Sequence, residues 1–375
     1  MPPPPPPLPD ELLEEIFLRL PPYEPASLVR ASLASKLWLG RLTGPRFRGQ
    51  YRDFHGAPPM LGFVYFSSSD SVPPFVPTTK FGGARFPDDW GSRKYSAWDC
   101  RHGRVLLQHE DEPPLKFFLW DPMTGARKEL YAPDRCSSLG AAVLCAGAAG
   151  CDHTACHEGR FQVAFVGVKQ THGGCVAYAR ASLSETDEWG EPCPDLHLLA
   201  PYGAFIEAVP SVLIQDTLYF MLGYHPDEHV EILKYDLTSN RLSLIDAPRA
   251  LARDSILMAM EDGSLGFAHV VGLTLYLWSR QMGGSDGVAS WTQHRVIDLN
   301  KLLHSQNLEK IPRPVGSIEG SDTIFLIAEL GIYEIRLKSL RWKKLWKIDK
   351  LSALFPYMSF YNPPAERASH RVAAH

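Results

Sequence analysis

A strand-turn-strand motif recurs through most of this 375-residue chain and limits the folds that the chain can adopt. In each copy an apolar strand ends in a turn and a polar strand follows. Clear copies occupy residues 117–130, 232–245 and 332–346. Two weaker copies end with the segments 178–189 and 275–297. One anchor position per copy gives separations of 59, 56, 43 and 57 residues between Asp121, Arg180, Asp236, Ser279 and Arg336. A period of about fifty with about four strands per unit is typical of β-propeller blades in the kelch length class.

The apolar residues beyond about residue 56 have a period of two, which predicts strands. The predicted strands are 61–66, 104–108, 115–120, 161–168, 211–222, 273–278, 322–329 and 331–337. Residues 340–347 alternate basic and apolar side chains, so we interpret them as a strand of the last copy and not as a nuclear import signal. No long helical pattern separates the strands, so we expect an antiparallel all-β domain and not a parallel α/β fold.

The number of blades follows from the two ends of this region. Five copies of the motif are visible, and a sixth blade can form if the early strand 61–66 pairs with the late segment 355–361. Propellers are commonly closed by such pairing, because it leaves no free edge between the first and last blades. We therefore predict a β-propeller over about 56–363, with six blades favoured and seven as the alternative.

The first fifty residues have a different pattern. Six prolines at positions 2–7 predict a disordered polyproline leader over 1–7. Asp10 then opens a predicted helix of period 3.6 that Pro21 and Pro22 end. Its charged residues share one face, and its apolar residues share the other: Leu12, Leu13, Ile16, Phe17 and Leu20.

Two more short helices are predicted before residue 50. The second starts near Pro25 or Ala26 and carries Leu28, Val29 and Leu33; the third carries Leu37, Trp38 and Leu42 and ends before Gly44 and Pro45. A helical unit of about forty residues has only a marginal core. We therefore expect part of its apolar surface to be buried against a partner.

Two other interpretations of this unit remain open. The apolar stripe at Leu12, Ile16 and Leu20 can be an ordinary internal core. Residues 25–52 contain six basic side chains and no acidic one, so three helices here can also resemble a DNA-binding helix-turn-helix. The predicted third helix offers leucine, tryptophan and glycine where base-contacting residues would stand, which favours a solvated basic surface over DNA binding.

Specific residues of this unit resemble a known module. The run from Leu8 to Pro21, the step from Ala26 to Ala31 and the element from Lys36 to Trp38 occur in the order found in the F-box of the large plant family. The resemblance covers about Leu8 to Arg48, and Ser35 departs from it where the family usually has cysteine. Farther along, 99–107, 120–125 and 355–363 resemble the F-box-associated β-propeller domain of plant proteins.

The resemblance implies a partner and the residues that contact it. An F-box docks on the Skp-type adaptor of a cullin-RING ubiquitin ligase and reaches the cullin through that adaptor. Carried over to this sequence, the adaptor-binding residues are Leu8, Pro9, Leu12, Leu13, Ile16, Phe17, Leu20, Pro21, Leu28, Val29, Leu33 and Trp38. The resemblance to the propeller domain assigns no ligand.

Composition excludes several other classes of partner. A net charge of -4 argues against a surface built for nucleic acid or anionic lipid, so a partner attracted by charge must be met by a local patch. We find no secretory signal and no apolar segment of membrane-spanning length. Seven cysteines without such a signal indicate reduced thiols, so we expect a cytoplasmic or nuclear location.

Nothing in the sequence requires catalysis, and we predict no catalytic residue, cofactor or metal. Nucleophile elbows, phosphate-binding loops and zinc-protease motifs do not occur. One loop, 145–157, clusters cysteine and histidine, so a zinc site from Cys151, His153, Cys156 and His157 is conceivable. Its spacing fits none of the usual zinc knuckles, and a small-residue loop with incidental thiols is favoured. Most of the tryptophans are expected in blade cores, with a few free to line a central pocket.

These inferences predict an α+β multidomain protein. It has a trihelical F-box at 8–50, a β-propeller at 56–363 and a disordered tail at 364–375. Its predicted function is to recruit an unknown target protein through the propeller to a Skp-cullin-F-box ubiquitin ligase. The alternative is a propeller that binds carbohydrate or peptide beside a non-functional F-box.

Overall fold

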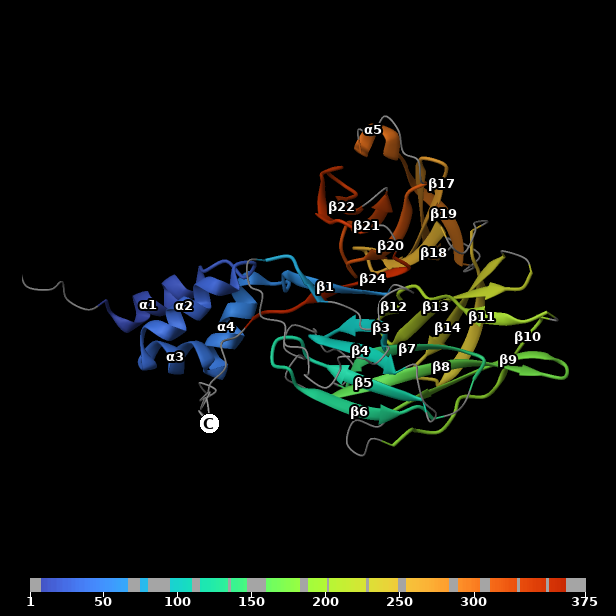
Figure 1. The fold of residues 1–375 in the computed structure, drawn as a ribbon, viewed down its shortest axis with the longest axis horizontal. Coiled ribbons are helices and arrows are strands. Elements are labelled where there is room, and N and C mark those ends of the chain that lie inside the picture. Colours follow the sequence, from blue (N-terminus) through green and yellow to red (C-terminus); the bar gives the residue numbers. More distant parts are fainter. Residues whose placement is uncertain are drawn as a thin grey trace, which may run out of the picture.

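The computed structural model places a helical unit beside a β-propeller (Figure 1). The structure describes residues 8–66, 75–79, 95–109, 115–133, 136–146, 160–182, 188–200, 202–226, 229–248, 254–282, 289–303, 311–328, 331–348 and 351–361. The predicted leader 1–7 and tail 364–375 lie outside these residues. None of the described helices has the length and apolar character needed to cross a membrane.

Four helices form the N-terminal unit: α1 (Asp10–Leu18), α2 (Pro25–Ala34), α3 (Lys36–Thr43) and α4 (Pro45–His55). The side chain of Ser35 accepts a hydrogen bond from Leu37 N at 3.2 Å and caps α3. The three predicted helices are present, and the third ends before Gly44 and Pro45 as expected, but a fourth helix that was not predicted follows it. Proline fits the first position of a helix, where its missing N–H has no partner to lose, so Pro45 starts α4.

Six sheets built from the described strands form the six blades. The strands are β1 (Met60–Phe66), β2 (Phe75–Pro77), β3 (Tyr95–Arg101), β4 (Arg104–His109), β5 (Lys116–Trp120), β6 (Arg127–Tyr131), β7 (Ser138–Cys145), β8 (Phe161–Thr171), β9 (Gly174–Ala181), β10 (Leu196–Leu198), β11 (Ala204–Ile206), β12 (Val212–Ile214), β13 (Thr217–Tyr224), β14 (Val230–Asp236), β15 (Arg241–Asp246), β16 (Ser255–Ala259), β17 (Leu265–Val271), β18 (Thr274–Met282), β19 (Ala289–Asp298), β20 (Arg313–Ser317), β21 (Thr323–Ala328), β22 (Gly331–Arg336), β23 (Trp342–Trp346) and β24 (Ala353–Met358). A short helix, α5 (Leu299–Leu303), connects β19 to β20.

The blades follow one another along the chain. The first five sheets have the orders β3-β4-β5-β6, β7-β8-β9-β10, β11-β13-β14-β15 with β12 also on β13, β16-β17-β18-β19 and β20-β21-β22-β23. The first strands of neighbouring blades contact one another in a closed ring, in which β24 lies between β20 and β3. The all-β antiparallel prediction and the favoured count of six blades are therefore confirmed.

The sixth blade joins the two ends of the propeller. Its order is β2-β1-β24, and Val64 of β1 pairs with Phe355 of β24 in antiparallel register. This is the predicted closure of 61–66 against 355–361. All eight predicted strands are present, but 211–222 forms two strands, because a turn with Gln215 at φ 52° separates β12 from β13. The repeating anchors mark the third strand of each of the first five blades.

Apolar residues fill the spaces between adjacent blades. One cluster joins β16–β18 to β21 and β22 through Ile256, Leu277 and Ile335, and another joins β22 to β1 and β24 through Ile332, Phe63 and Leu354. Each blade therefore buries both of its faces, as strands of a multi-sheet ring must. The outer strands β6, β15 and β23 carry exposed side chains, whereas Phe75 and Val76 of the outer strand β2 are buried.

Candidate partner-binding surfaces

The helical unit exposes apolar side chains on α1. Leu12 and Ile16 are 47% and 46% exposed, and they share one face because they lie four residues apart on a helix. Leu8, just before α1, is 53% exposed. Leu12 and Ile16 therefore lie outside the internal core. The alternative interpretation, in which this apolar stripe is an ordinary core, does not hold for these two residues. An exposed apolar face of this kind marks a contact surface.

The other predicted adaptor-binding residues lie at several depths. Pro9 and Leu33 are exposed, whereas Leu13, Leu20, Pro21, Val29 and Trp38 are half-buried. Phe17 and Leu28 are buried in the core of the unit, where the ring of Phe17 meets that of Trp38 edge-on at 5.1 Å. These two residues hold the helices together and lie below the surface that a partner could contact.

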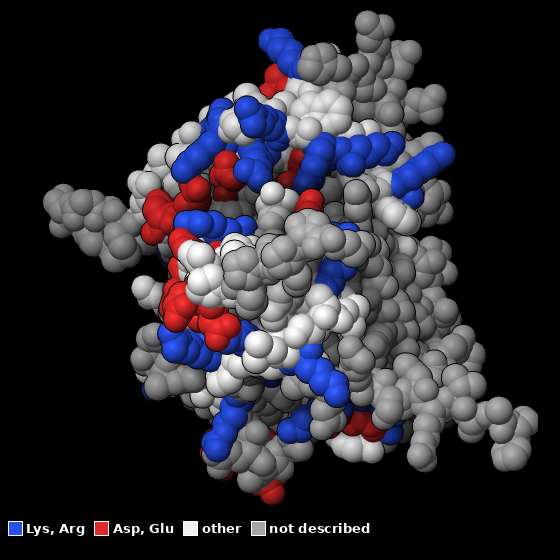
Figure 2. Space-filling view, turned by 90° about the vertical axis from the view of Figure 1, so that its left-hand side faces the viewer, with Lys and Arg blue, Asp and Glu red and all other residues white. Residues whose placement is uncertain are grey.

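Acidic residues of α1 pair with the basic residues that follow. Asp10 forms an ion pair with Arg41 of α3, and Glu14 lies 3.9 Å from Arg46 of α4. Two of the six basic side chains that suggested DNA binding are thus paired with carboxylates. Acidic and basic side chains lie side by side on this face of the molecule (Figure 2). This mixed charge does not form the continuous basic surface that phosphate binding requires.

Helix α4 connects the helical unit to the propeller. The hydroxyl of Tyr51 donates to the carbonyl of Leu20 at 2.7 Å, and burial raises the pKa of that hydroxyl above its ordinary value. The ring of Tyr51 meets Phe360 edge-on at 5.9 Å. Phe360 follows β24 and belongs to the same buried cluster as Phe17 and Leu28. The core of the helical unit is thus completed by a residue from the far end of the chain.

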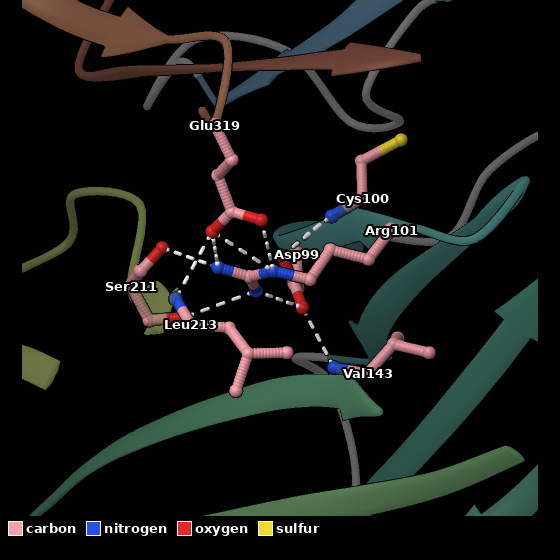
Figure 3. A network of polar contacts seen from close by, with 7 residues as sticks. All are labelled: Asp99, Cys100, Arg101, Val143, Ser211, Leu213 and Glu319. Atoms are coloured by element: carbon pink, nitrogen blue, oxygen red, sulfur yellow. Dashed lines mark hydrogen bonds and ion pairs between the residues drawn. The ribbon is translucent and has the colours of Figure 1, made fainter. Parts of the chain in front are cut away.

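A charged network lies at the centre of the propeller (Figure 3). Asp99 and Arg101 of β3 form a buried ion pair, and Arg101 also bonds Glu319, which follows β20. The guanidinium further donates to the backbone carbonyl and the hydroxyl of Ser211, just before β12, at 2.6 and 3.2 Å. This central network therefore joins the first, third and fifth blades across the ring of inner strands.

Backbone groups satisfy the carboxylates of the central network. Oδ2 of Asp99 accepts from Val143 N of β7 at 2.6 Å, and Oε1 of Glu319 accepts from Leu213 N of β12 at 3.0 Å. Burial raises the pKa of Asp99. Burial lowers the pKa of Arg101, but the charges of Asp99 and Glu319 outweigh it and raise that pKa overall. The polar groups have partners inside the chain, so this network links the blades that supply them.

Sequence reasoning missed both Phe360 and the central network. Residues 99–107 were noted for their resemblance to plant propellers and not for their charge. The available signal was the pair Asp99 and Arg101 at the end of an otherwise apolar strand, where unpaired charges are costly. No local pattern could have identified Ser211 or Glu319 as their partners.

The described residues contain no cluster of metal ligands. The proposed zinc ligands Cys151, His153, Cys156 and His157 lie outside the described residues, so the structure does not test that site. Five cysteines within the described part are free thiols: Cys100, Cys136, Cys145, Cys175 and Cys193.

Most tryptophans were expected in blade cores, but of the described ones in the propeller only Trp120 is buried, and four others are half-buried at contacts between blades. Trp120 is fully buried, and the indoles of Trp189 and Trp291 donate to backbone carbonyls of a preceding outer strand, at Tyr131 and Asp246. Trp342 and Trp346 differ, because they are 38% and 46% exposed on the outer strand β23. Trp90 lies outside the described residues.

Two family models match the chain. The F-box domain model matches residues 7–48, and the model described as F-box protein AT5G49610-like, beta-propeller, matches 96–363. The second match begins after β1 and β2, although β1 closes the last blade. The boundaries predicted from the sequence, 8–50 and 56–363, stay predictions.

Three of the solved structures that resemble this chain are only distantly similar to it. A protein from Lactobacillus plantarum has 10% identity and a TM-score of 0.42, covering 77% of this chain and 82% of its own. TolB from Acinetobacter baumannii has 10% identity and a TM-score of 0.38, covering 83% and 70%. An uncharacterized Listeria monocytogenes protein has 9% identity and a TM-score of 0.39, covering 71% and 86%. Similarities this weak carry no information about function. No curated protein matches the chain.

Proposed function

Because the chain belongs to the family of F-box proteins with an AT5G49610-like β-propeller, we propose that it recruits a target protein to a Skp-cullin-F-box ubiquitin ligase. The F-box and propeller together characterise a substrate-receptor type of protein. In this proposal the F-box binds the Skp-type adaptor, the propeller binds the target, and the chain itself performs no chemistry. Other subunits transfer ubiquitin, and this chain raises the local concentration of the target.

The exposed apolar face of α1 is the observation that supports adaptor binding most directly. Leu12 and Ile16 remain near half exposed, outside the core that Phe17, Leu28 and Phe360 share. An exposed leucine and isoleucine on one helix face gain free energy when a partner covers them, at about 25 cal/mol per Å² of apolar surface. We place Leu8, Pro9 and Leu33 in the same contact surface, with half-buried Leu13 and Trp38 at its margin.

The contact between Phe360 and Tyr51 supports the second half of the proposal. It fixes the end of β24 against α4, so the helical unit and the propeller are held together by packing as well as by the connecting chain. A receptor that holds its target at a fixed position relative to the ligase benefits from such a rigid connection. Five free cysteines fit a reducing compartment, so we propose a cytosolic or nuclear location.

Co-purification with a Skp-type adaptor tests the proposal. Ile16→Asp places a charge in the proposed contact and should abolish capture, because an unpaired charge buried in an interface is strongly unfavourable. Val271→Asp is the matched control, since Val271 is an exposed apolar residue, 60% accessible, at a hairpin of the propeller. We expect the wild type and the control to capture the adaptor equally.

Two outcomes would contradict the proposal. If a folded wild type captures no adaptor, the F-box is non-functional here and the propeller acts as a ligand-binding domain for carbohydrate or peptide. If Ile16→Asp captures the adaptor as well as the wild type does, the contact surface lies elsewhere on the molecule.

A further inference from the structure

The outer strand of the fifth blade, β23, exposes an unusual combination of side chains. Four of its five residues are exposed, and they include two tryptophans and two lysines. We define the β23 patch as Arg336, Arg341, Trp342, Lys344, Trp346 and Lys347, all of them exposed. Residues 336–347 contain six basic side chains and no acidic one, in a chain whose net charge is -4.

Much of this positive charge is not neutralised within the described part of the chain. Lys343 pairs with Glu334 at 3.0 Å, and Lys338 pairs with Glu261. Within the described residues, Arg336, Arg341 and Lys347 have no carboxylate partner. Lys and Arg side chains gather in the upper part of the face seen in Figure 2, at the height where β22 lies in Figure 1. A partner that complements this patch is acidic.

The two tryptophans lie on opposite faces of the blade. Trp342 pairs across the strands with Ile335, which packs toward the fourth blade, and Trp346 pairs with Ile332, which packs toward the sixth. A register shift opposite Ile332 and Tyr333 produces this arrangement, because an extra residue in β23 moves Trp346 to the other face. The two rings therefore stand on either side of the edge of β23 that pairs with no described strand.

Among the described residues, the outer edge of β23 is also open for backbone pairing. β23 pairs with β22 on one side and with no other described strand. An unpaired strand edge can accept another extended chain through main-chain hydrogen bonds, which is a common mode of peptide recognition. Unlike Trp189 and Trp291, the indoles of Trp342 and Trp346 form no hydrogen bond to a neighbouring blade within the described residues.

From this geometry we propose that the β23 patch binds an extended acidic segment of the target protein, which adds to the fifth blade as a further antiparallel or parallel strand. Its side chains alternate between the two faces and meet one tryptophan on each, while its carboxylates meet Arg341, Lys344 and Lys347. The proposal deepens the proposed function and rests on it, since it gives the chemistry of the target. Figure 1 shows β22, the neighbour of β23, on the same side of the propeller as the helical unit, so a segment held here faces the side of the F-box.

Single-stranded RNA is the other ligand with complementary charge. Bases stack on aromatic side chains that form one platform, whereas Trp342 and Trp346 face opposite sides of the blade. Their placement suits a strand between two rings better than a row of stacked bases. The acidic peptide is therefore the occupant that this surface favours.

Fluorescence anisotropy with the purified full chain tests the proposal. The probe is a labelled peptide of about ten residues that alternates glutamate with valine, which favours the extended conformation. Trp346→Ala should weaken its binding about tenfold, as loss of an interface tryptophan typically does. Arg341→Glu and Lys347→Glu should each weaken it about threefold or more, and the effect should shrink as salt is added. Arg241→Glu, an exposed reversal on outer strand β15, is the matched control and should bind as the wild type does.

Three outcomes would overturn the proposal. The first is that the wild type does not bind the glutamate-valine probe, or binds a lysine-valine peptide equally well. The second is that an acidic peptide with pairs of consecutive prolines along its length binds equally well, since one residue of each pair must point toward β23 and proline has no N–H to donate. The third is that an oligouridylate binds more tightly than the peptide and loses binding in the same variants.

Capture of the adaptor separates this inference from the proposed function. The β23 patch lies outside the F-box, so Trp346→Ala should still capture the adaptor. A chain that binds the probe but captures no adaptor contradicts only the proposed function. A chain that captures the adaptor but does not bind the probe contradicts only the assignment of β23.

Discussion

Arg101 and Glu319 lie 218 residues apart in the sequence and meet at the centre of the propeller, where Nε of Arg101 donates to both carboxylate oxygens of Glu319 at 3.1 Å. Arg101 also neutralises buried Asp99. One guanidinium thus connects the first blade to the fifth, and Ser211 adds the third. The closed ring of blades is what brings these groups together.

Removing the guanidinium should therefore be costly. Arg101→Ala leaves Asp99 as a buried carboxylate without its partner, and we expect a loss of about 3–5 kcal/mol in the free energy of unfolding, measured by urea denaturation. The matched control is Arg19→Ala, which removes the exposed pair of Arg19 with Glu15 and should change stability by less than about 1 kcal/mol. Equal effects of the two substitutions would show that the central network contributes no more than a surface pair.

Phe360 should control the stability of the helical unit. Phe360→Ala removes a ring that is only 7% exposed from the core formed with Tyr51. We expect the free energy needed to open the helices to fall by about 3 kcal/mol. Hydrogen exchange of the amides in α1–α4 measures this effect. Phe54→Ala is the control, because Phe54 is 56% exposed and should leave exchange unchanged. Unchanged protection in Phe360→Ala would mean that the helical unit is stable without the propeller.

The two sides of the helical unit should respond differently to truncation. Leu28 is buried, so Leu28→Ala should cost about 2–5 kcal/mol through lost burial and a cavity. Leu12 is half exposed, so Leu12→Ala should change stability by less than about 0.5 kcal/mol and weaken only adaptor capture. Thermal unfolding and co-purification of both variants check this division. A large loss of stability in Leu12→Ala would place that side chain in the core.

Gly316 should be essential for the junction of the fifth and sixth blades. A Cβ on Gly316 would lie 2.4 Å from the backbone oxygen of Leu354 in β24, so Gly316→Ala must push the closing strand away. We expect the free energy of unfolding, measured with denaturant, to fall by about 1–3 kcal/mol. Gly49 lies in α4 with open space around it, and Gly49→Ala should instead stabilise the chain by up to about 1 kcal/mol. A neutral Gly316→Ala would show that β24 can shift without opening the ring.

His269 should make the propeller sensitive to acid. This residue of β17 is buried and stacks on Tyr276 at 5.1 Å, and burial lowers its pKa below the ordinary 6.5. His269 then binds a proton more readily in the unfolded chain than in the folded one. The stability that neutral His269 contributes is therefore present above about pH 6.5 and falls as the pH drops below it. His269→Phe keeps the ring without the titration. Thermal midpoints at about pH 7.5 and about pH 5.5 should differ less in this variant than in the wild type; an equal difference would assign the acid sensitivity to other groups.

Local sequence pattern was enough to predict the class and order of the elements. Strand period, turn residues and a repeat of about fifty residues depend on near neighbours in the chain, so they predicted the blades and even the pairing of β1 with β24. Local pattern was insufficient at two positions. Pro45 follows one helix and starts the next, and Gln215 forms a turn inside an apolar run that was predicted as one strand. The resemblance of Leu8 to Arg48 predicted the contact surface of the F-box, but not which of its apolar residues remain exposed.

Contacts between residues far apart in the sequence become visible only in the folded chain. Burial of Phe17 and exposure of Ile16 depend on how α1 packs against α3 and α4, and Phe360 reaches that core from the end of the last blade. The central network needs a closed ring before Arg101 can face Glu319. Trp346 lies on the other face of the blade from Trp342 because the pairing between β22 and β23 shifts. Such contacts arise from packing and register between segments that no local pattern connects.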